Sequence, residues 1–165
     1  MTIEKYPKVE QIVIDKIREE EEKFRWGKEF GGYLIVENNN ITDVVFDVKK
    51  SSFYEVHFGI ENILKIPEEQ RNNVRGWFHK HSIDNLSHVD IQTVFQLTKF
   101  WGECYTLVLQ RNGYLLLVKT IVGVDLIYRK ETFIETHRRE IKYKEGPYGF
   151  IHIPQSIRNF QCRRV

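Results

Sequence analysis

The sequence predicts a single α/β domain, because stretches with helical spacing of apolar residues alternate with short runs rich in valine, isoleucine and aromatic residues. Its 165 residues lie in the size range of one domain with one hydrophobic core. A content of 41% hydrophobic and 29% charged residues is typical of a globular protein and excludes a disordered or fibrous one. We therefore expect residues 1–165 to form one unit around one core.

The N-terminal half is predicted to contain a helix followed by a hairpin. Ile14 and Ile17 belong to an apolar pattern with helical spacing, and the run of asparagines at 38–40 supplies turn residues between two strand-like runs. The expected elements are a helix over 9–24, strands over 30–36, 41–48 and 53–58, and a short helix with a loop within 60–73.

The C-terminal half is predicted to contain one more helix and several strands. Asn112 and Gly113 form a strong hairpin signal between two apolar runs. The expected elements are a strand over 74–81, a loop over 82–86, a helix from Ser87 to about Trp101, and strands over 104–109, 114–120 and 122–128. Residues 133–141 fit either a helix or a strand, and Gly146-Pro147 begins a tail of uncertain order, basic over about 144–165.

Charge and cysteine content limit the classes of partner and the compartment. A formal net charge of +2 gives no reason to expect nucleic acid. Residues 1–10 are too polar for a signal peptide, and no run approaches the roughly 18 apolar residues of a membrane span. Cys104 and Cys162 lie far apart and predict neither a disulfide framework nor a thiolate metal site. These observations favour a cytoplasmic protein without a membrane partner.

A metal site is predicted where the strand over 74–81 meets the following helix. His79 and His81 lie two positions apart, and alternation along a strand directs both imidazoles to the same face. Catalytic zinc sites use such neutral imidazoles, with three protein ligands and one open position. Asp90 supplies the third ligand if the loop folds back, because it follows Ser87, the expected N-cap, in the first turn of the helix. The helix dipole there favours its charged form by about 0.3–1 kcal/mol.

Each of these motifs also has a purely structural interpretation. Ser-x-x-Asp is a frequent helix cap, and His-x-His occurs by chance in sheets. The combination, with five residues between His81 and Ser87, favours a functional site over coincidence. His57 fits a packed or exposed position better than a ligand position. His88 fits the surface or a place beside the metal ligands better than a ligand position. Cys104 is expected to begin a buried strand, and as a nucleophile it has no partner in the sequence.

The order of motifs resembles that of the JAMM (MPN-plus, Mov34/JAB) zinc isopeptidase family. Glu29-Phe-Gly-Gly-Tyr-Leu is followed by Gly-Trp-Phe-His79-Lys-His81 and then by Ser87-x-x-Asp90, and the similarity in element order covers roughly 9–128. The resemblance implies one zinc ion per chain, held by the two histidines and the aspartate. It also implies that Glu29 is the acid-base residue and that Ser87 steadies the oxyanion, although Ser87 also fits the role of a helix cap alone.

The resemblance further implies a fold and an activity. The fold is a mixed, largely antiparallel curved sheet flanked by helices (MPN/JAB, cytidine-deaminase-like). The activity is hydrolysis of the amide or isopeptide bond after the C-terminal tail of a ubiquitin-like or sulfur-carrier protein. Zinc lowers the pKa of bound water to about 7, and proton transfer by Glu29 would contribute about 10²–10⁴ in rate. Eukaryotic deubiquitinating members of the family carry insertions around the core, and the chain between Asp90 and Tyr128 leaves little room for one. We therefore expect a minimal enzyme similar to prokaryotic or phage-type members.

The sequence departs from the family pattern at three points, none of which removes a ligand. Ser82 stands where proline is frequent in the family, and Val36 stands where the family has a glycine. The spacer of five residues between His81 and Ser87 is shorter than the spacer usual in the family. Two alternatives stay open: a non-catalytic MPN-type scaffold or binding module, and a metal amidohydrolase that acts on small peptides. Homodimerisation is also left open.

Overall fold

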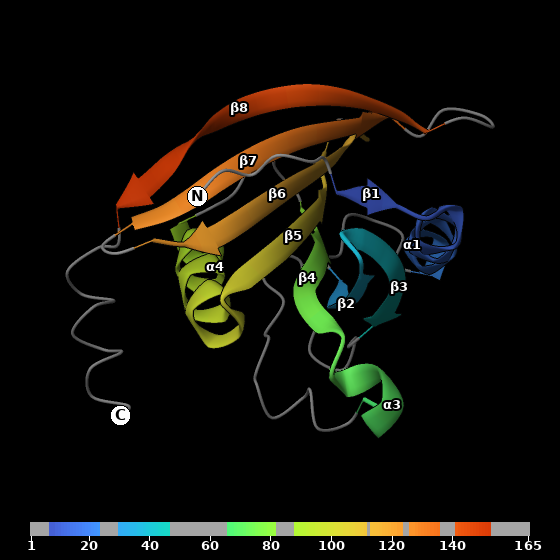
Figure 1. The fold of residues 1–165 in the computed structure, drawn as a ribbon. Helices are drawn as coiled ribbons and strands as arrows, with labels where there is room; N and C mark the ends of the chain where they lie inside the picture. Colours follow the sequence, from blue (N-terminus) through green and yellow to red (C-terminus); the bar gives the residue numbers. More distant parts are fainter. Residues whose placement is uncertain are drawn as a thin grey trace.

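The computed structural model describes residues 7–23, 30–46, 66–81, 88–111, 113–123, 126–135 and 141–152, which form a curved sheet with helices beside it (Figure 1). In chain order, the elements are β1 (Lys8–Val9), α1 (Gln11–Lys23), β2 (Gly31–Glu37), β3 (Asn40–Phe46), α3 (Glu68–Arg71), β4 (Val74–Lys80), α4 (His88–Trp101), β5 (Glu103–Leu109), β6 (Leu115–Val122), β7 (Leu126–Glu135) and β8 (Lys142–His152). The predicted α/β class is therefore confirmed.

The described strands form one eight-stranded sheet in the order β1-β3-β2-β4-β5-β6-β7-β8. The β1/β3 and β4/β5 neighbours are parallel, and the other pairs are antiparallel. The sheet is thus mixed and largely antiparallel, as expected. Parallel neighbours need a crossover connection, usually a helix, and α4 is the helix between β4 and β5. This connection brings the start of α4 back to the end of β4, where the histidines lie.

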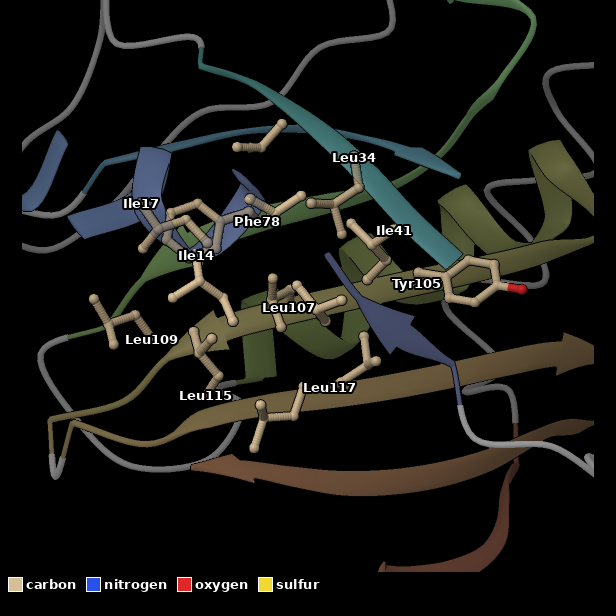
Figure 2. Packing of buried hydrophobic residues seen from close by; sticks show 14 of the residues in the cluster. Ile14, Ile17, Leu34, Ile41, Phe78, Tyr105, Leu107, Leu109, Leu115 and Leu117 are labelled. Carbon is tan, nitrogen blue, oxygen red and sulfur yellow. The ribbon is translucent and has the colours of Figure 1, made fainter. Parts of the chain in front are cut away.

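The larger part of the core lies on the face of the sheet that α1 covers. Figure 2 shows Ile14 and Ile17 of α1 close to Phe78 of β4. Helical spacing places Val13, Ile14 and Ile17 on one buried side of α1. The cluster consists of Val9, Val13, Ile14, Ile17, Phe30, Leu34, Val36, Ile41, Val44, Phe78, Tyr105, Leu107, Leu109, Leu115, Leu117 and Ile134.

The N-terminal elements follow the sequence-based prediction with shifted boundaries. The first helix begins at Gln11 rather than at residue 9, because Val9 belongs to β1 and pairs with Ile41 in β3. The expected asparagine turn is present, with positive φ angles of 50° at Asn38 and 64° at Asn39. Asparagine adopts this left-handed conformation more readily than most residues. The turn accordingly closes the β2–β3 hairpin.

The C-terminal elements differ more from the prediction. The last predicted strand, 122–128, is divided between the end of β6 and the start of a longer β7, which extends through the ambiguous 133–135 segment. The tail expected from about residue 144 begins inside β8. Gly146 and Pro147 fit there because the β7/β8 register shifts between Lys130 and Thr132 and because, among the described strands, β8 is at the edge of the sheet. Edge strands and bulges tolerate such residues.

Several predicted features lie outside the described residues. These are the strand at 53–58, the loop over 82–86, Glu29, Ser87, His57, Cys162 and the tail beyond residue 152. Among the described helices, none combines the length and apolar character that crossing a membrane requires.

Candidate metal centre

Strand β4 directs its side chains alternately to the two faces of the sheet, and this alternation selects the residues of the candidate site. Phe78 joins the core under α1, whereas Trp77 packs with Val94 and Leu97 of α4 on the opposite face. His79 and His81 follow Trp77 at two-residue intervals, so strand alternation places them on the α4 face as well. The centroids of the two imidazole rings lie 4.6 Å apart, so the predicted common orientation is confirmed.

The backbone of β4 approaches its neighbour β5 very closely at Gly76. A Cβ atom at this position would lie 2.1 Å from the carbonyl oxygen of Tyr105, a distance that no side chain could tolerate. Glycine is therefore required by the close pairing of the two parallel strands, in which Gly76 is the partner of Tyr105. This pairing fixes the position of the histidine segment relative to β5.

Helix α4 contributes Asp90 from its first turn. One carboxylate oxygen, Oδ2, lies 3.0 Å from Nε2 of His81, and the other, Oδ1, lies 3.4 Å from Nε2 of His79. All three side chains are buried, with exposed fractions of 2% for His79, 6% for His81 and 7% for Asp90. A buried carboxylate thus lies between two buried imidazoles from another element.

The three side chains form a group that could hold a metal ion. Each offers one ligand atom, and these atoms all lie within 4.8 Å of one another. Nitrogen and carboxylate oxygen ligands of this kind suit divalent transition metals. Buried carboxylates in proteins are normally paired or coordinate a metal. The arrangement is therefore chemically suited to a divalent cation with two nitrogen ligands and one oxygen ligand.

The electrostatic environment keeps His79 neutral. Burial lowers the pKa of His79 from 6.5 to about 4; the negative charge of Asp90 acts in the opposite direction, and His81 adds to the lowering. At neutral pH the imidazole therefore carries no proton on one of its nitrogens. A neutral imidazole is the form that binds metals, because protonation removes the lone pair.

Two residues that the motifs did not indicate support His79, Trp77 by direct contact and Thr106 through Trp77. The indole of Trp77 stacks on its imidazole, with ring centroids 4.8 Å apart and an interplanar angle of 16°. The indole Nε1 donates a hydrogen bond of 2.7 Å to Oγ1 of Thr106 in β5, which is the partner of Trp77 in the strand register. No local pattern marks Thr106, since its role depends on how β4 pairs with β5.

Cys104 lies on the same face of the sheet but is unsuited to nucleophilic chemistry. Its side chain is fully buried in the cluster with Trp77, Val94 and Leu97. Burial raises the pKa of the thiol to about 12, against a smaller lowering effect of the contact with Thr106. The reactive thiolate is therefore disfavoured at neutral pH. The prediction that Cys104 begins a buried strand is confirmed, since β5 starts at Glu103.

The structure thus brings together the three residues predicted as metal ligands. It does not describe Glu29 or Ser87, so their predicted roles stay predictions. His88 opens α4, and its side chain lies outside the described part of the structure.

Comparisons with known proteins give no independent assignment. Neither the scan against protein-family models nor the search of curated proteins finds a match for this chain.

Proposed function

We propose that this chain is a zinc metallo-isopeptidase of the JAMM type. In this proposal, His79, His81 and Asp90 bind one zinc ion and Glu29 moves the proton. The reaction is hydrolysis of the amide or isopeptide bond after the C-terminal tail of a ubiquitin-like or sulfur-carrier protein. The observation that carries the proposal is the meeting of the two imidazoles and the carboxylate in a buried group assembled from β4 and α4.

The separations between the ligand atoms are compatible with a small divalent cation, and we propose zinc. Ligands about 2.0–2.1 Å from a tetrahedral zinc ion lie roughly 3.3 Å from one another. Oδ1 of Asp90 lies 3.4 Å from Nε2 of His79 and Oδ2 lies 3.0 Å from Nε2 of His81, close to this value. The three ligand atoms as a set lie within 4.8 Å of one another. Three protein ligands also leave one position open, which is the usual arrangement in catalytic rather than structural zinc sites.

The chemistry divides between the metal and the protein. When bound, zinc supplies a Lewis acid and lowers the pKa of water to about 7. In the proposed reaction Glu29 accepts a proton from the attacking water and transfers it to the leaving amine. Phe30, the residue after Glu29 in the sequence, accepts a hydrogen bond of 2.8 Å from the backbone N–H of Lys80, between the two histidines. Glu29 is therefore the sequence neighbour of a residue that is hydrogen-bonded to β4, the strand that carries His79.

The fold also supports the proposal at a coarse level. The MPN/JAB resemblance implies a mixed, largely antiparallel curved sheet, and the described strands form a sheet of that kind with α4 inserted between β4 and β5. In the family pattern the aspartate follows the histidines on the next helix, and Asp90 stands at that place. Assignment of this sheet to the MPN fold is part of the proposal.

The proposal is tested by separating zinc binding from hydrolysis. Wild-type chain and the Glu29→Gln variant are loaded with zinc and incubated with fusions in which a short peptide follows the tail of a ubiquitin-like or sulfur-carrier protein. We expect the wild type to cleave the fusion, and Glu29→Gln to bind zinc equally but to lose about 10²–10⁴ in rate. Glu22→Gln is the matched control, because Glu22 is an exposed carboxylate of α1. It should behave as the wild type does.

The outcomes distinguish the alternatives. Full activity of Glu29→Gln would contradict the assigned mechanism. Zinc binding by the wild type without cleavage of any fusion would favour a non-catalytic scaffold. Cleavage of short peptides alone, with no dependence on the carrier protein, would favour a small-peptide amidohydrolase.

A further inference from the structure

Within the described part of the chain, the imidazole of His79 lacks the hydrogen bond that normally orients a metal-binding histidine. Such histidines almost always donate their second ring N–H to a carboxylate, a carbonyl group or water, which fixes the tautomer and the ring orientation. In His79, Nε2 faces Asp90, and the buried Nδ1 has no hydrogen-bond partner within the described ranges. Another interaction must therefore hold this ring.

Aromatic contacts confine the ring of His79 from two directions. The indole of Trp77 lies nearly parallel to it, at 4.8 Å between centroids and 16° between planes. The imidazole of His81 lies nearly perpendicular to it, at 4.6 Å and 84°. A rotation of the His79 ring about its χ2 bond would break the stack with Trp77 and carry Nε2 away from Asp90.

The indole of Trp77 is itself held firmly in place. Its Nε1 donates a 2.7 Å hydrogen bond to the buried hydroxyl of Thr106, and the ring packs against Val94 and Leu97 of α4. A buried indole N–H that loses its acceptor is left unsatisfied at a cost in free energy, so the bond opposes any rotation of the ring. Because Thr106 lies directly opposite Trp77 in the β4/β5 register, this restraint comes from the sheet itself.

We infer that Trp77 and Thr106 are positioning residues of the metal centre, which fix the ring plane of His79 so that Nε2 is presented to the metal. In most histidine metal ligands, an acceptor that binds the second ring N–H fixes the orientation of the ring. In this chain the stacked indole of Trp77 fixes it instead. The inference rests on the metal site of the proposed function but not on the hydrolytic activity. It predicts that the metal affinity of the folded protein depends on an indole and on a hydroxyl that never touch the metal.

The test compares zinc affinity across two pairs of variants. Trp77→Leu and Thr106→Val remove the stack and the hydrogen-bond acceptor. Trp101→Leu and Thr120→Val are their matched controls, because Trp101 packs in the same α4 cluster and Thr120 is a buried, hydrogen-bonded threonine on the adjacent strand. Zinc dissociation constants are measured by competition with a chromophoric chelator, at a temperature where circular dichroism shows every variant folded.

The expected result is a loss that depends on the stack and not on packing in general. Trp77→Leu should bind zinc about 10–100-fold more weakly, the range typical for loss of an outer partner of a metal ligand. Thr106→Val should show a smaller loss, and Thr106→Ser, which keeps the hydroxyl, should restore the affinity. Trp101→Leu and Thr120→Val should lower the melting temperature while leaving the dissociation constant within about twofold of the wild type.

A second readout reports on the ring itself. In the zinc-loaded protein, long-range ¹H–¹⁵N correlation spectra of the imidazoles should show His79 protonated at Nδ1 and metal-bound through Nε2. In Trp77→Leu the absorption bands of the cobalt-substituted protein should shift or broaden, because the ligand ring is no longer held in one plane. The spectrum of Trp101→Leu should match that of the wild type.

The inference is overturned if Trp77→Leu and Thr106→Val bind zinc as tightly as the wild type, or if the control variants weaken binding by the same factor. Absence of zinc binding by the wild type would instead remove the metal site and the inference together. If Trp77→Leu does not fold, the comparison of Thr106→Val with Thr106→Ser and Thr120→Val decides the question, because Thr→Val keeps the side-chain shape and Thr→Ser removes only one methyl group.

Discussion

The two faces of the sheet are built from the same strands but differ in the chemistry that they bury. On the α1 face, Phe78 belongs to a cluster of hydrophobic residues. On the α4 face, its neighbours Trp77 and His79 belong to a layer that also buries histidine, aspartate and threonine side chains. Consecutive residues of β4 therefore contribute alternately to the main hydrophobic core and to the face that carries the candidate metal centre.

The difference shows how one strand can contribute both to the stability of the fold and to the geometry of a polar site. Apolar burial on the α1 face contributes stability that does not depend on a ligand. The α4 face instead depends on specific pairs, such as Thr98 with Thr120 at 2.8 Å and Trp77 with Thr106 at 2.7 Å. Buried polar groups are costly unless they are satisfied, so this face needs exact partners where the other needs only volume and shape. Substitutions on the α1 face should consequently change mainly the free energy of unfolding, whereas substitutions on the α4 face should also change its pH dependence and the zinc affinity.

The largest effect on stability is expected from the α1 face. Phe78→Ala removes a fully buried ring that contacts Phe30 and Phe46 at centroid distances of 5.5 Å and 6.1 Å. We expect the free energy of unfolding to fall by roughly 3–5 kcal/mol. Urea unfolding followed by circular dichroism measures this change. Zinc affinity of the molecules that remain folded should be nearly unchanged, and a loss as large as that of His79→Ala would show that the two faces are not separable.

A second expected difference between the faces is sensitivity to acid. The pKa of His79 is about 4 in the folded metal-free chain and 6.5 ordinarily. The unfolded chain therefore binds a proton at a higher pH than the folded chain. Stability should fall as the pH is lowered from 6.5 towards 4, by up to roughly 3 kcal/mol.

The check is urea unfolding of chelator-treated protein at several pH values in this range. His79→Gln should flatten the profile, while Phe78→Ala should lower it at every pH without changing its slope. An identical slope in the wild type and in His79→Gln would assign the acid sensitivity to other groups.

The smallest effect is expected at Lys80, which lies between the two histidines but on the α1 side. Its ammonium group lies 3.9 Å from the carboxylate of Glu21, and both groups are partly exposed. Pairs of this kind contribute about 0–1 kcal/mol. Lys80→Met should therefore shift the unfolding midpoint only slightly and should leave zinc affinity unchanged. A marked loss of zinc binding would indicate that α1 also determines the geometry of the centre.

The sequence predicted those features of the site that depend on local spacing. Alternation in a strand was sufficient to place His79 and His81 on one face, and the helix-start pattern was sufficient to place Asp90 in the first turn of α4. The structure adds that the β4–α4–β5 connection brings Asp90 within 3.0 Å of His81. The short spacer before Ser87 thus does not prevent the three side chains from meeting.

Features that depend on pairing between distant strands could not be predicted in the same way. Thr106 lies 29 positions from Trp77, and nothing in its own segment indicates a bond to the indole. Gly146-Pro147 indicates a break when considered locally, yet a register shift beside an edge strand accommodates both residues within β8. Val9 likewise fits the helical pattern of α1, but its pairing with Ile41 makes it part of β1.

The most direct test of the central claim is the zinc content of the chain and of three single variants. Wild-type protein is stripped with a chelator, re-metallated, dialysed and analysed by inductively coupled plasma mass spectrometry alongside His79→Ala, His81→Ala and Asp90→Asn. We expect one zinc ion per wild-type chain and a near-complete loss in each variant, with the fold retained by circular dichroism. A wild-type chain that retains no zinc, or variants that retain a full equivalent, would contradict the account.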